Sequence, residues 1–240
     1  MDSDRTLRWD ACVNSRDLGG LSAGARRVRG GALVRSDSLA RLTDAGRAAV
    51  LAHGIRTVID LRGEAEAASY PNPFAADAAV TYRLVPQQDE AVWREFASVA
   101  TRGEYDSAVI DRRAGAMVAM ARAFAGAPEG GVVVHCVAGK DRTGLAVALL
   151  LALVGVSDDT IAEDYSLSHH ALRPEYEAAI AKATSDAERD RLAFSFDARA
   201  DSIGVVLAHL AARHGGAEAY LMRAGLSSAD VLRIRERLLD

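Results

Sequence analysis

GVVVHCVAGKDRTG, residues 131–144, is the stretch that decides the fold of this chain. Gly131 and the three valines after it predict a buried strand, and the apolar run 143–154 predicts a helix. A tight loop between a strand and a helix N-terminus directs backbone N–H groups toward one point, where the helix dipole adds positive potential. The stretch therefore predicts an anion site at the carboxyl end of a strand.

The residues of this loop suit a phosphate ester. A cysteine thiol in such surroundings ionises readily and becomes a nucleophile, which makes Cys136 the candidate. The planar fork of Arg142 matches two oxygens of a phosphate group. A nucleotide-binding P-loop would need glycine at position 134 and Ser or Thr at position 141, where this chain has Val134 and Asp141. We therefore predict a nucleophile within a phosphate-binding loop.

The loop resembles the signature of cysteine-dependent protein tyrosine phosphatases. More narrowly, it is similar to that of the atypical bacterial tyrosine and phosphoinositide phosphatases, whose loop reads Gly-Lys-Asp-Arg-Thr-Gly. The resemblance covers nearly the whole chain and is weakest between Gln87 and Pro128. Its other matching segments are Asn14–Gly20, Leu33–Leu39, Ile59–Arg62, Glu163–Tyr165 and Gly216–Gly225.

The expected reaction has two steps. The Cys136 thiolate attacks phosphorus to form a cysteinyl-phosphate, and water then hydrolyses it. Arg142 and the backbone amides of the phosphate-binding residues stabilise the phosphoryl oxygens. Thr143 is expected to hydrogen-bond the sulfur, to cap the following helix, or both, and His135 to orient the loop through buried hydrogen bonds. The phosphate-binding residues are Val137, Ala138, Gly139, Lys140, Asp141, Arg142 and Thr143.

The leaving oxygen needs a proton from a carboxylic acid. Asp89, just beyond a strand that ends near Pro86, lies where the resembled family keeps its acid, and we favour it. Asp141 in the loop shares or takes that role in the alternative assignment, with Glu90 as a further candidate. Asp89 could instead be a plain helix N-cap.

Lys140 is expected to add a second cation at the rim of the loop. Of the 29 basic residues only Lys140 and Lys182 are lysines, so a lysine in this loop stands out. We expect it to contact the additional phosphates of a phosphoinositide. Several charged residues near the N-terminal motifs are expected to hold that segment in place rather than touch substrate: Asn14, Arg16, Asp17, Arg35, Asp60 and Arg62.

The predicted fold class is α/β, with a central, mostly parallel sheet flanked by helices, like a protein tyrosine phosphatase. Strands are expected at 55–61, 80–85 and 131–135, and the chain reads as helical from Ser157 onward. A length of 240 residues fits a single phosphatase domain over 1–240. Residues 89–126 are polar and alanine-rich and predict an insertion between two core strands, with two helices around Gly103. The resemblance implies that this insertion is a helical lid over the active site.

Composition limits the classes of molecule and the cellular compartment that we expect for this protein. A net charge of −4 and a pI near 5.9 argue against a nucleic-acid binder. No run of eighteen apolar residues predicts a membrane span, and the charged N-terminus lacks a signal core, so we expect a cytoplasmic protein, with signal-free export left open. Cys12 and Cys136 are expected to be reduced. No metal or cofactor is predicted, and His169-His170 reads as helix surface.

The leading functional hypothesis is a phosphomonoesterase that acts on phosphotyrosine and extends to phosphoserine, phosphothreonine and phosphoinositides. One alternative is a phosphoinositide-specific phosphatase. A phosphate-binding pseudophosphatase adaptor is a weaker alternative, because Cys136, Arg142 and Thr143 are all intact. A sulfur transferase is also weaker, because its loop usually has four residues between cysteine and arginine or lacks this Arg-Thr-Gly exit. The sequence leaves the oligomeric state and the physiological substrate undetermined.

Overall fold

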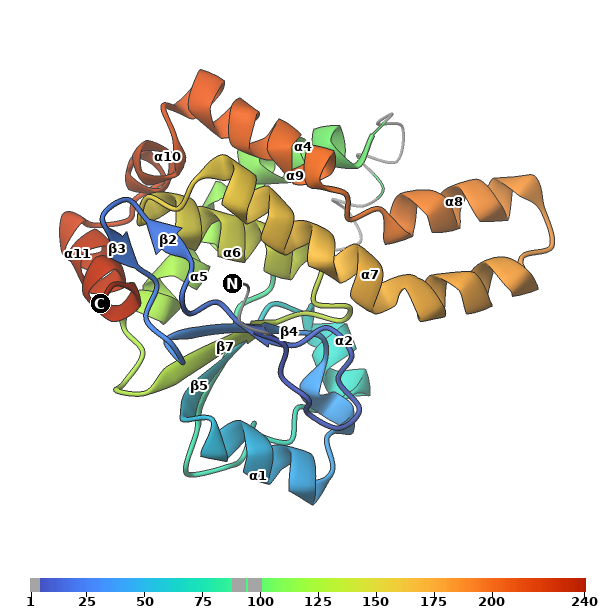
Figure 1. Cartoon of the computed structure of the whole chain (residues 1–240), viewed down its shortest axis with the longest axis horizontal. Coiled ribbons are helices and arrows are strands. Elements are labelled where there is room, and N and C mark those ends of the chain that lie inside the picture. Colours follow the sequence, from blue (N-terminus) through green and yellow to red (C-terminus); the bar gives the residue numbers. More distant parts are fainter. Residues whose placement is uncertain (1–4, 88–93, 95–100) are drawn as a thin grey trace.

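The centre of the fold is a five-stranded sheet, seen in a computed structural model that describes residues 5–87, 94 and 101–240 (Figure 1). The strands lie in the order β1-β4-β7-β5-β6, with β1 antiparallel to β4 and the other neighbours parallel. The predicted mostly parallel α/β sheet is therefore confirmed. The strands are β1 (Arg16–Asp17), β4 (Leu33–Ser36), β5 (Ile55–Asp60), β6 (Thr81–Leu84) and β7 (Gly131–His135).

Strand β7 is buried on both faces. Val132 and Val134 belong to the larger hydrophobic core, while Val133 points to a smaller core on the opposite face. This alternation follows from the two-residue period of a strand, and a strand covered on both sides needs apolar residues throughout. The continuous valine run is thus the sequence signature of the central strand.

Helices cover the two faces unequally. In Figure 1 helix α1 lies on one side of the sheet, and the helices that follow β6 lie on the other side. The described helices are α1 (Asp44–Ala52), α2 (Glu64–Ser69), α4 (Arg102–Arg112), α5 (Ala114–Ala125), α6 (Asp141–Leu153), α7 (Asp158–Lys182), α8 (Asp186–Phe196), α9 (Ala200–His209), α10 (Ala217–Arg223) and α11 (Ser228–Leu238), with a 3-10 turn η1 (Leu39–Arg41), a π-helical turn η2 (Leu210–His214) and a small hairpin of β2 (Ser22–Ala23) and β3 (Arg26–Arg27).

Helix α6 lies at the centre of the larger core. Every residue from Thr143 to Leu151 is buried, which explains why this helix is apolar all round rather than on one stripe. Its N-terminus follows β7 after a loop of five residues, 136–140. A fully packed helix of this kind holds the phosphate-binding loop in place from behind.

Of the segment predicted as a lid, the structure describes residue 94 and residues 101–126, and the two helices there are not centred on Gly103. The two helices α4 and α5 meet at Arg113, whereas Gly103 lies in the first turn of α4, against the backbone of Ser202 on α9. Helix α5 buries Met117, Met120 and Phe124 in the core. Residues 101–126 therefore form packed layers of the fold, because their apolar faces are covered by α6, α9 and α11.

Helices α7 and α8 form an arm that projects from the body (Figure 1). Ser157 caps α7 by accepting a hydrogen bond from the Thr160 N–H, which confirms the helix start predicted there. Helix α8 has no buried residues. The arm is therefore held mainly at its base, where α7 joins the core and α8 runs into α9.

Candidate active site

The loop after β7 brings together the residues that the sequence singled out. Cys136 is 3% exposed and directly follows the last residue of β7. Helix α6 begins at Asp141, so Arg142 and Thr143 are its second and third residues. The predicted order of strand, tight loop and helix N-terminus is confirmed. Unpaired N–H groups of the first helical turn therefore lie next to the thiol.

The shape of the loop is set by contacts to its backbone carbonyls. Asn14 Nδ2 donates to the carbonyls of Ala138 (2.9 Å) and Gly139 (3.2 Å), and Arg35 Nη2 donates to Gly139 O (2.9 Å). Within the described part of the chain, no acceptor takes up the N–H groups of residues 137–140. Because the C=O and N–H of a peptide point in opposite directions, fastening the carbonyls outward leaves the amides for an anion.

Gly139 is required at the closest point of this loop. Its φ is +66°, and a Cβ there would lie 2.5 Å from both the Asp37 nitrogen and the Ser36 carbonyl oxygen. Any side chain would therefore push the loop away from β4, and the left-handed backbone adds to the penalty.

A buried cluster of charges supports Arg35. Asp164 on α7 accepts hydrogen bonds from Arg35 Nη1 (2.8 Å), Arg16 Nε (3.0 Å) and Arg5 Nη1 (2.9 Å). Burial alone would raise the pKa of Asp164, but the three arginines outweigh it and hold that pKa well below its usual range. Burial and the neighbouring Arg35 lower the pKa of Arg16 to about 10. As the sequence predicted, these residues hold the N-terminal segment in place.

His135, the last residue of β7, is fully buried and orients the start of the loop. Its Nδ1 is 3.0 Å from the Cys136 carbonyl, which only accepts, so Nδ1 carries the proton. Its Nε2 then accepts from Asn72 Nδ2 at 2.9 Å. Burial lowers the pKa of His135, which keeps the ring neutral. Both nitrogens are thus engaged in positioning contacts.

Arg142 is held by a residue that the sequence analysis did not single out. Glu66 on α2 accepts from Arg142 Nη1 (2.5 Å) and Nη2 (2.9 Å), a bidentate pair. These hydrogen bonds lower the pKa of Glu66 and raise that of Arg142, whose charge is thereby secured despite burial. No signal in the sequence distinguishes Glu66 from Glu64, because only the fold shows which glutamate faces the loop.

Thr143 has a buried hydroxyl that is free to act. Its Oγ1 has no hydrogen-bond partner among the described residues, although the side chain is fully buried. It is the third residue of α6, so it is not the helix N-cap; that position belongs to Lys140. An unpaired buried hydroxyl is costly, which points to a partner supplied during the reaction.

Lys140 does not lie where the sequence analysis placed it. Its ammonium is buried and donates to the carbonyls of Ser195 (2.5 Å) and Asp197 (2.8 Å), where α8 passes into α9. It also pairs with Asp141 Oδ1 at 2.9 Å. The expectation of a second cation at the rim is therefore corrected, because these three oxygens draw the side chain into the protein.

Asp141 is an ionised carboxylate in this arrangement. Its side chain is 24% exposed and lies 3.3 Å from Arg102 Nη2 as well as beside Lys140. Burial would raise the pKa of Asp141, but Arg102 and Lys140 outweigh it and lower that pKa below the ordinary value. A general acid must hold a proton, so these contacts argue against Asp141 as the donor in the ligand-free state.

Asp89 and Glu90 lie outside the described residues. The chain that leads to them is described as far as Gln87, whose N–H donates to Leu61 O at 3.3 Å. The Leu61 N–H in turn donates to His135 O at 2.8 Å. At Gln87 the chain therefore leaves the sheet at the same edge at which Cys136 follows β7.

The second cysteine has a different environment. Cys12 is half-buried, and its sulfur lies 3.8 Å from the Ser38 carbonyl. Burial, with a contribution from Asp37, raises the pKa of Cys12 to about 12. Cys12 is therefore a protonated thiol at neutral pH, and both cysteines are free, as the sequence analysis expected.

Beside the loop lies a cavity of about 640 Å³. Val137 and Ala138 of the loop line it, together with Glu66, Tyr70 and Leu172. The exposed ring of Tyr70 is at its edge. This space is large enough for an aryl phosphate next to the loop.

The chain is similar in sequence to known tyrosine phosphatases. The model of the Tyrosine phosphatase family matches residues 7–240. A tyrosine-protein phosphatase of Nostoc commune is 32% identical over 224 residues, which cover 89% of this chain and 76% of the relative. The triple specificity protein phosphatase PtpB of Mycobacterium tuberculosis is 32% identical over 262 residues, which cover 90% of this chain and 93% of the relative. A crystal structure of P. aeruginosa TpbA with phosphotyrosine is 19% identical and covers 77% of this chain and 89% of its own, with a TM-score of 0.34.

The chain belongs to the tyrosine phosphatase family, as the family match and the two relatives show. Its activity is that of a protein-tyrosine phosphatase, a hydrolase that removes phosphate from tyrosine. Across the described residues, no helix has both the length and the apolar character needed to pass through a bilayer.

Proposed function

We propose that hydrolysis proceeds through a cysteinyl-phosphate on Cys136. The thiolate attacks phosphorus as the P–O bond to the tyrosine breaks, and the leaving oxygen takes a proton from a carboxylic acid. Water then attacks phosphorus while the carboxylate takes a proton from the water, the S–P bond breaks, and thiolate and inorganic phosphate are released. Arg142 and the amides of residues 137–143 bind the phosphoryl oxygens in both steps.

The observation that carries this proposal is the support around the loop. Glu66 presents the guanidinium of Arg142 as a rigid fork, and Asn14 and Arg35 hold the loop carbonyls away from the site. Electrostatic stabilisation works best when the donors are already in place before the reaction. We assign Thr143 to the second step, in which a hydrogen bond from its free Oγ1 would stabilise the departing thiolate.

The two free cysteines allow a matched test of the nucleophile. Cys136→Ser should lower kcat on a phosphotyrosine peptide by on the order of 10⁴-fold or more while vanadate or phosphate still binds. Cys12→Ser should keep the wild-type rate, because its protonated thiol plays no part in the reaction. A Cys136→Ser enzyme that retains a tenth of the wild-type rate contradicts the assignment.

We propose Asp89 as the proton donor, with Asp141 as the alternative. The chain toward Asp89 leaves the sheet level with Cys136, and Asp141 is committed to Arg102 and Lys140. Asp89→Asn should therefore lower kcat on phosphotyrosine by about 10²–10⁴-fold and matter less for an activated leaving group. If only Asp141→Asn shows this dependence on the leaving group, Asp141 is the acid and the assignment is wrong.

We infer a substrate range wider than phosphotyrosine, including phosphoserine, phosphothreonine and phosphoinositides. The cavity beside the loop is open, and Arg41 on its wall is a cation available to a second phosphate. The relative PtpB is named for triple specificity, which supports breadth. Arg41→Ala should reduce kcat/KM for a phosphoinositide more than for a phosphotyrosine peptide. The control is Arg56→Ala, because Arg56 lies near the start of β5, at the end of that strand away from the phosphate loop. Equal losses on both substrates would remove Arg41 from substrate selection.

A further inference from the structure

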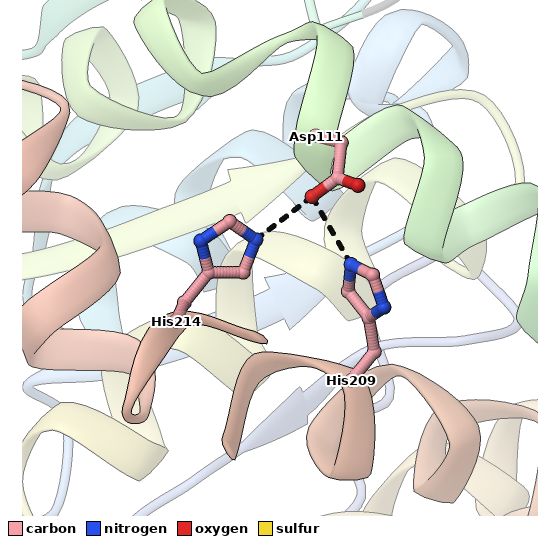
Figure 2. A group of neighbouring side chains, drawn as sticks. All are labelled: Asp111, His209 and His214. Atoms are coloured by element: carbon pink, nitrogen blue, oxygen red, sulfur yellow. Dashed lines mark hydrogen bonds and ion pairs between the residues drawn. The ribbon is translucent and has the colours of Figure 1, made fainter. Parts of the chain in front are cut away.

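A second group of titratable side chains lies away from the phosphate loop, where α4 meets α9 and η2. Asp111 comes from α4, His209 ends α9 and His214 ends η2. Figure 2 shows both imidazole rings pointing at one carboxylate oxygen of Asp111. That oxygen lies 2.8 Å from His214 Nε2 and 3.0 Å from His209 Nε2. The described residues thus include three metal-ligating side chains whose ligand atoms all lie within 4.8 Å of one another.

The backbone is distorted at the point that brings the two imidazoles together. Residues five apart on an α-helix point about 140° away from each other, since each residue turns by about 100°. The π-helical turn Leu210–His214 reduces this difference, and the ring centroids of His209 and His214 are 5.6 Å apart. Gly215 and Gly216 follow with φ of +73° and +99° and end the turn. Such π-turns are rare and frequently occur at functional sites.

The ligand set suits a particular class of metal. Two imidazole nitrogens and one carboxylate oxygen are the protein ligands of many zinc sites that keep a fourth position for water. Zinc–ligand bonds of 2.0–2.1 Å place tetrahedral ligands about 3.3 Å apart. The observed separations of 2.8 and 3.0 Å between Asp111 and the two histidines therefore need to widen by only about half an ångström or less, and the two imidazole nitrogens lie within 4.8 Å of each other.

The surroundings leave this site accessible to an ion. The side chains of Asp111, His209 and His214 are 27%, 24% and 18% exposed. Arg213 pairs with the other Asp111 oxygen at 3.4 Å, but its side chain is 66% exposed, and an exposed ion pair is weak. Tyr220 packs against His214 at 5.1 Å between ring centroids and donates to the Ile110 carbonyl, so one wall of the site is fixed.

We propose that Asp111, His209 and His214 bind a divalent transition-metal ion of the zinc class, with water as the fourth ligand. The ion would join α4 to η2 and take no part in phosphate hydrolysis, so the site is a function additional to the phosphatase reaction. This proposal departs from the expectation, drawn from the sequence, that the chain has no metal site. The two histidines were not apparent in the sequence because an ordinary helix would have placed them on different faces.

Metal binding should also stabilise the support of the phosphate loop. Helix α4 carries Arg102, which contacts Asp141, at the end opposite to Asp111. An ion that ties the Asp111 end of α4 to η2 restricts the movement of the whole helix. Because the ion binds the folded chain, saturating zinc should raise Tm, by roughly 5–10 °C at a hundredfold excess over Kd.

The test uses full-length Cys136→Ser protein, so that the nucleophilic thiol does not bind zinc. Equilibrium dialysis followed by metal analysis should give one equivalent of Zn²⁺. Substituting Co²⁺ should produce the visible absorption bands of a tetrahedral site, which hydrogen bonds between Asp111 and the two histidines do not produce. Binding of less than a fifth of an equivalent at micromolar Zn²⁺ would overturn the proposal.

Two variants in this background locate the ion. Asp111→Asn keeps an oxygen that accepts from both histidines, so the fold is retained, while His214→Ala removes a ligand. Each should weaken zinc binding at least tenfold, since loss of even an outer-shell partner costs about 10–100-fold. The control His169→Gln/His170→Gln alters the adjacent histidines on α7 and should bind zinc unchanged. Unaltered binding by Asp111→Asn and His214→Ala, or loss of binding in the control, places the ion elsewhere and rejects the site.

Discussion

The two sides of the phosphate loop are held by different kinds of contact. On the inner side, Asn14 and Arg35 bind the loop carbonyls, and Asp164 holds Arg35 in turn. All three of these side chains are almost completely buried in the body of the protein. The inner side therefore gives the loop a fixed shape.

On the outer side, Lys140 and Asp141 extend away from the sheet. Lys140 binds the carbonyls of Ser195 and Asp197 at the base of the projecting arm, and Asp141 meets Arg102 on α4. These partners belong to elements that pack on the core from outside. The outer side therefore couples the loop to the position of α4 and of the arm.

Buried charges therefore have two different roles around this anion site. On the inner side they fix the shape of the loop, and on the outer side they couple the loop to α4 and the arm. A change on the inner side should act first on stability, because it leaves a charge unpaired in the core. A change on the outer side should act mainly on turnover, because Asp141 still has Arg102 as a partner when Lys140 is removed.

The largest effect is expected from Asp164→Asn on the inner side. The substitution leaves Arg5, Arg16 and Arg35 without their shared counter-charge, and breaking a buried pair costs about 3–5 kcal/mol. Urea unfolding should show this loss in the free energy of unfolding. The control Asp186→Asn removes an exposed pair with Arg189 on α8 and should change stability by less than about 1 kcal/mol. Equal effects of the two variants would remove the distinction between buried and exposed charge.

Acid should weaken the inner side in a defined range. The pKa of Asp164 is lowered in the folded protein, so its contribution to stability is fully present above the unfolded value near 3.9. That contribution is lost as pH falls below about 4 toward the folded pKa, because the unfolded state then binds the proton first. Unfolding measured between pH 7 and pH 2 should therefore be less pH-dependent in Asp164→Asn than in wild type. An identical dependence would assign the acid sensitivity to other carboxylates.

Glu66→Gln tests a third support of the site, the contact between Glu66 and Arg142. Glutamine cannot accept both guanidinium bonds, so Arg142 loses its fixed orientation, and a misplacement of about 1 Å can cost roughly a hundredfold in rate. We expect a fall in kcat/KM of that order with little change in Tm. Glu64→Gln, on the same helix α2, is the matched control and should be near wild type. A Glu66→Gln enzyme with wild-type kcat/KM would show that Arg142 orients itself.

Lys140→Ala should give the smallest effect, on the outer side. The ammonium is buried against three protein oxygens, so its loss should lower turnover by about tenfold, in keeping with a charge-assisted contact worth roughly 1.5 kcal/mol. The loss should be equal for a phosphotyrosine peptide and a phosphoinositide, since Lys140 does not reach the rim. Lys182→Ala, at the end of α7, serves as the control. A loss confined to the phosphoinositide would restore Lys140 as a substrate-binding cation.

The sequence by itself determined the central strand, the loop and the helix that follows it. The valine run 132–134 and the apolar residues of α6 predict a buried strand and a buried helix. The loop between them must then lie at the carboxyl edge of the sheet, where parallel α/β folds bind their ligands. The same local logic located the start of α7, where Ser157 caps the helix. Signals of this kind depend only on residues a few positions away along the chain, so they can be read from the sequence alone.

Only the tertiary structure decided which distant side chains complete these elements. Glu66 faces Arg142 across 76 positions of the chain, and Lys140 turns toward a carbonyl 55 positions away instead of toward the rim. His209 and His214 meet Asp111 because a π-helical turn changes the face on which they lie. Burial and long-range pairing set these directions, and neither is encoded in the spacing of residues along a single segment.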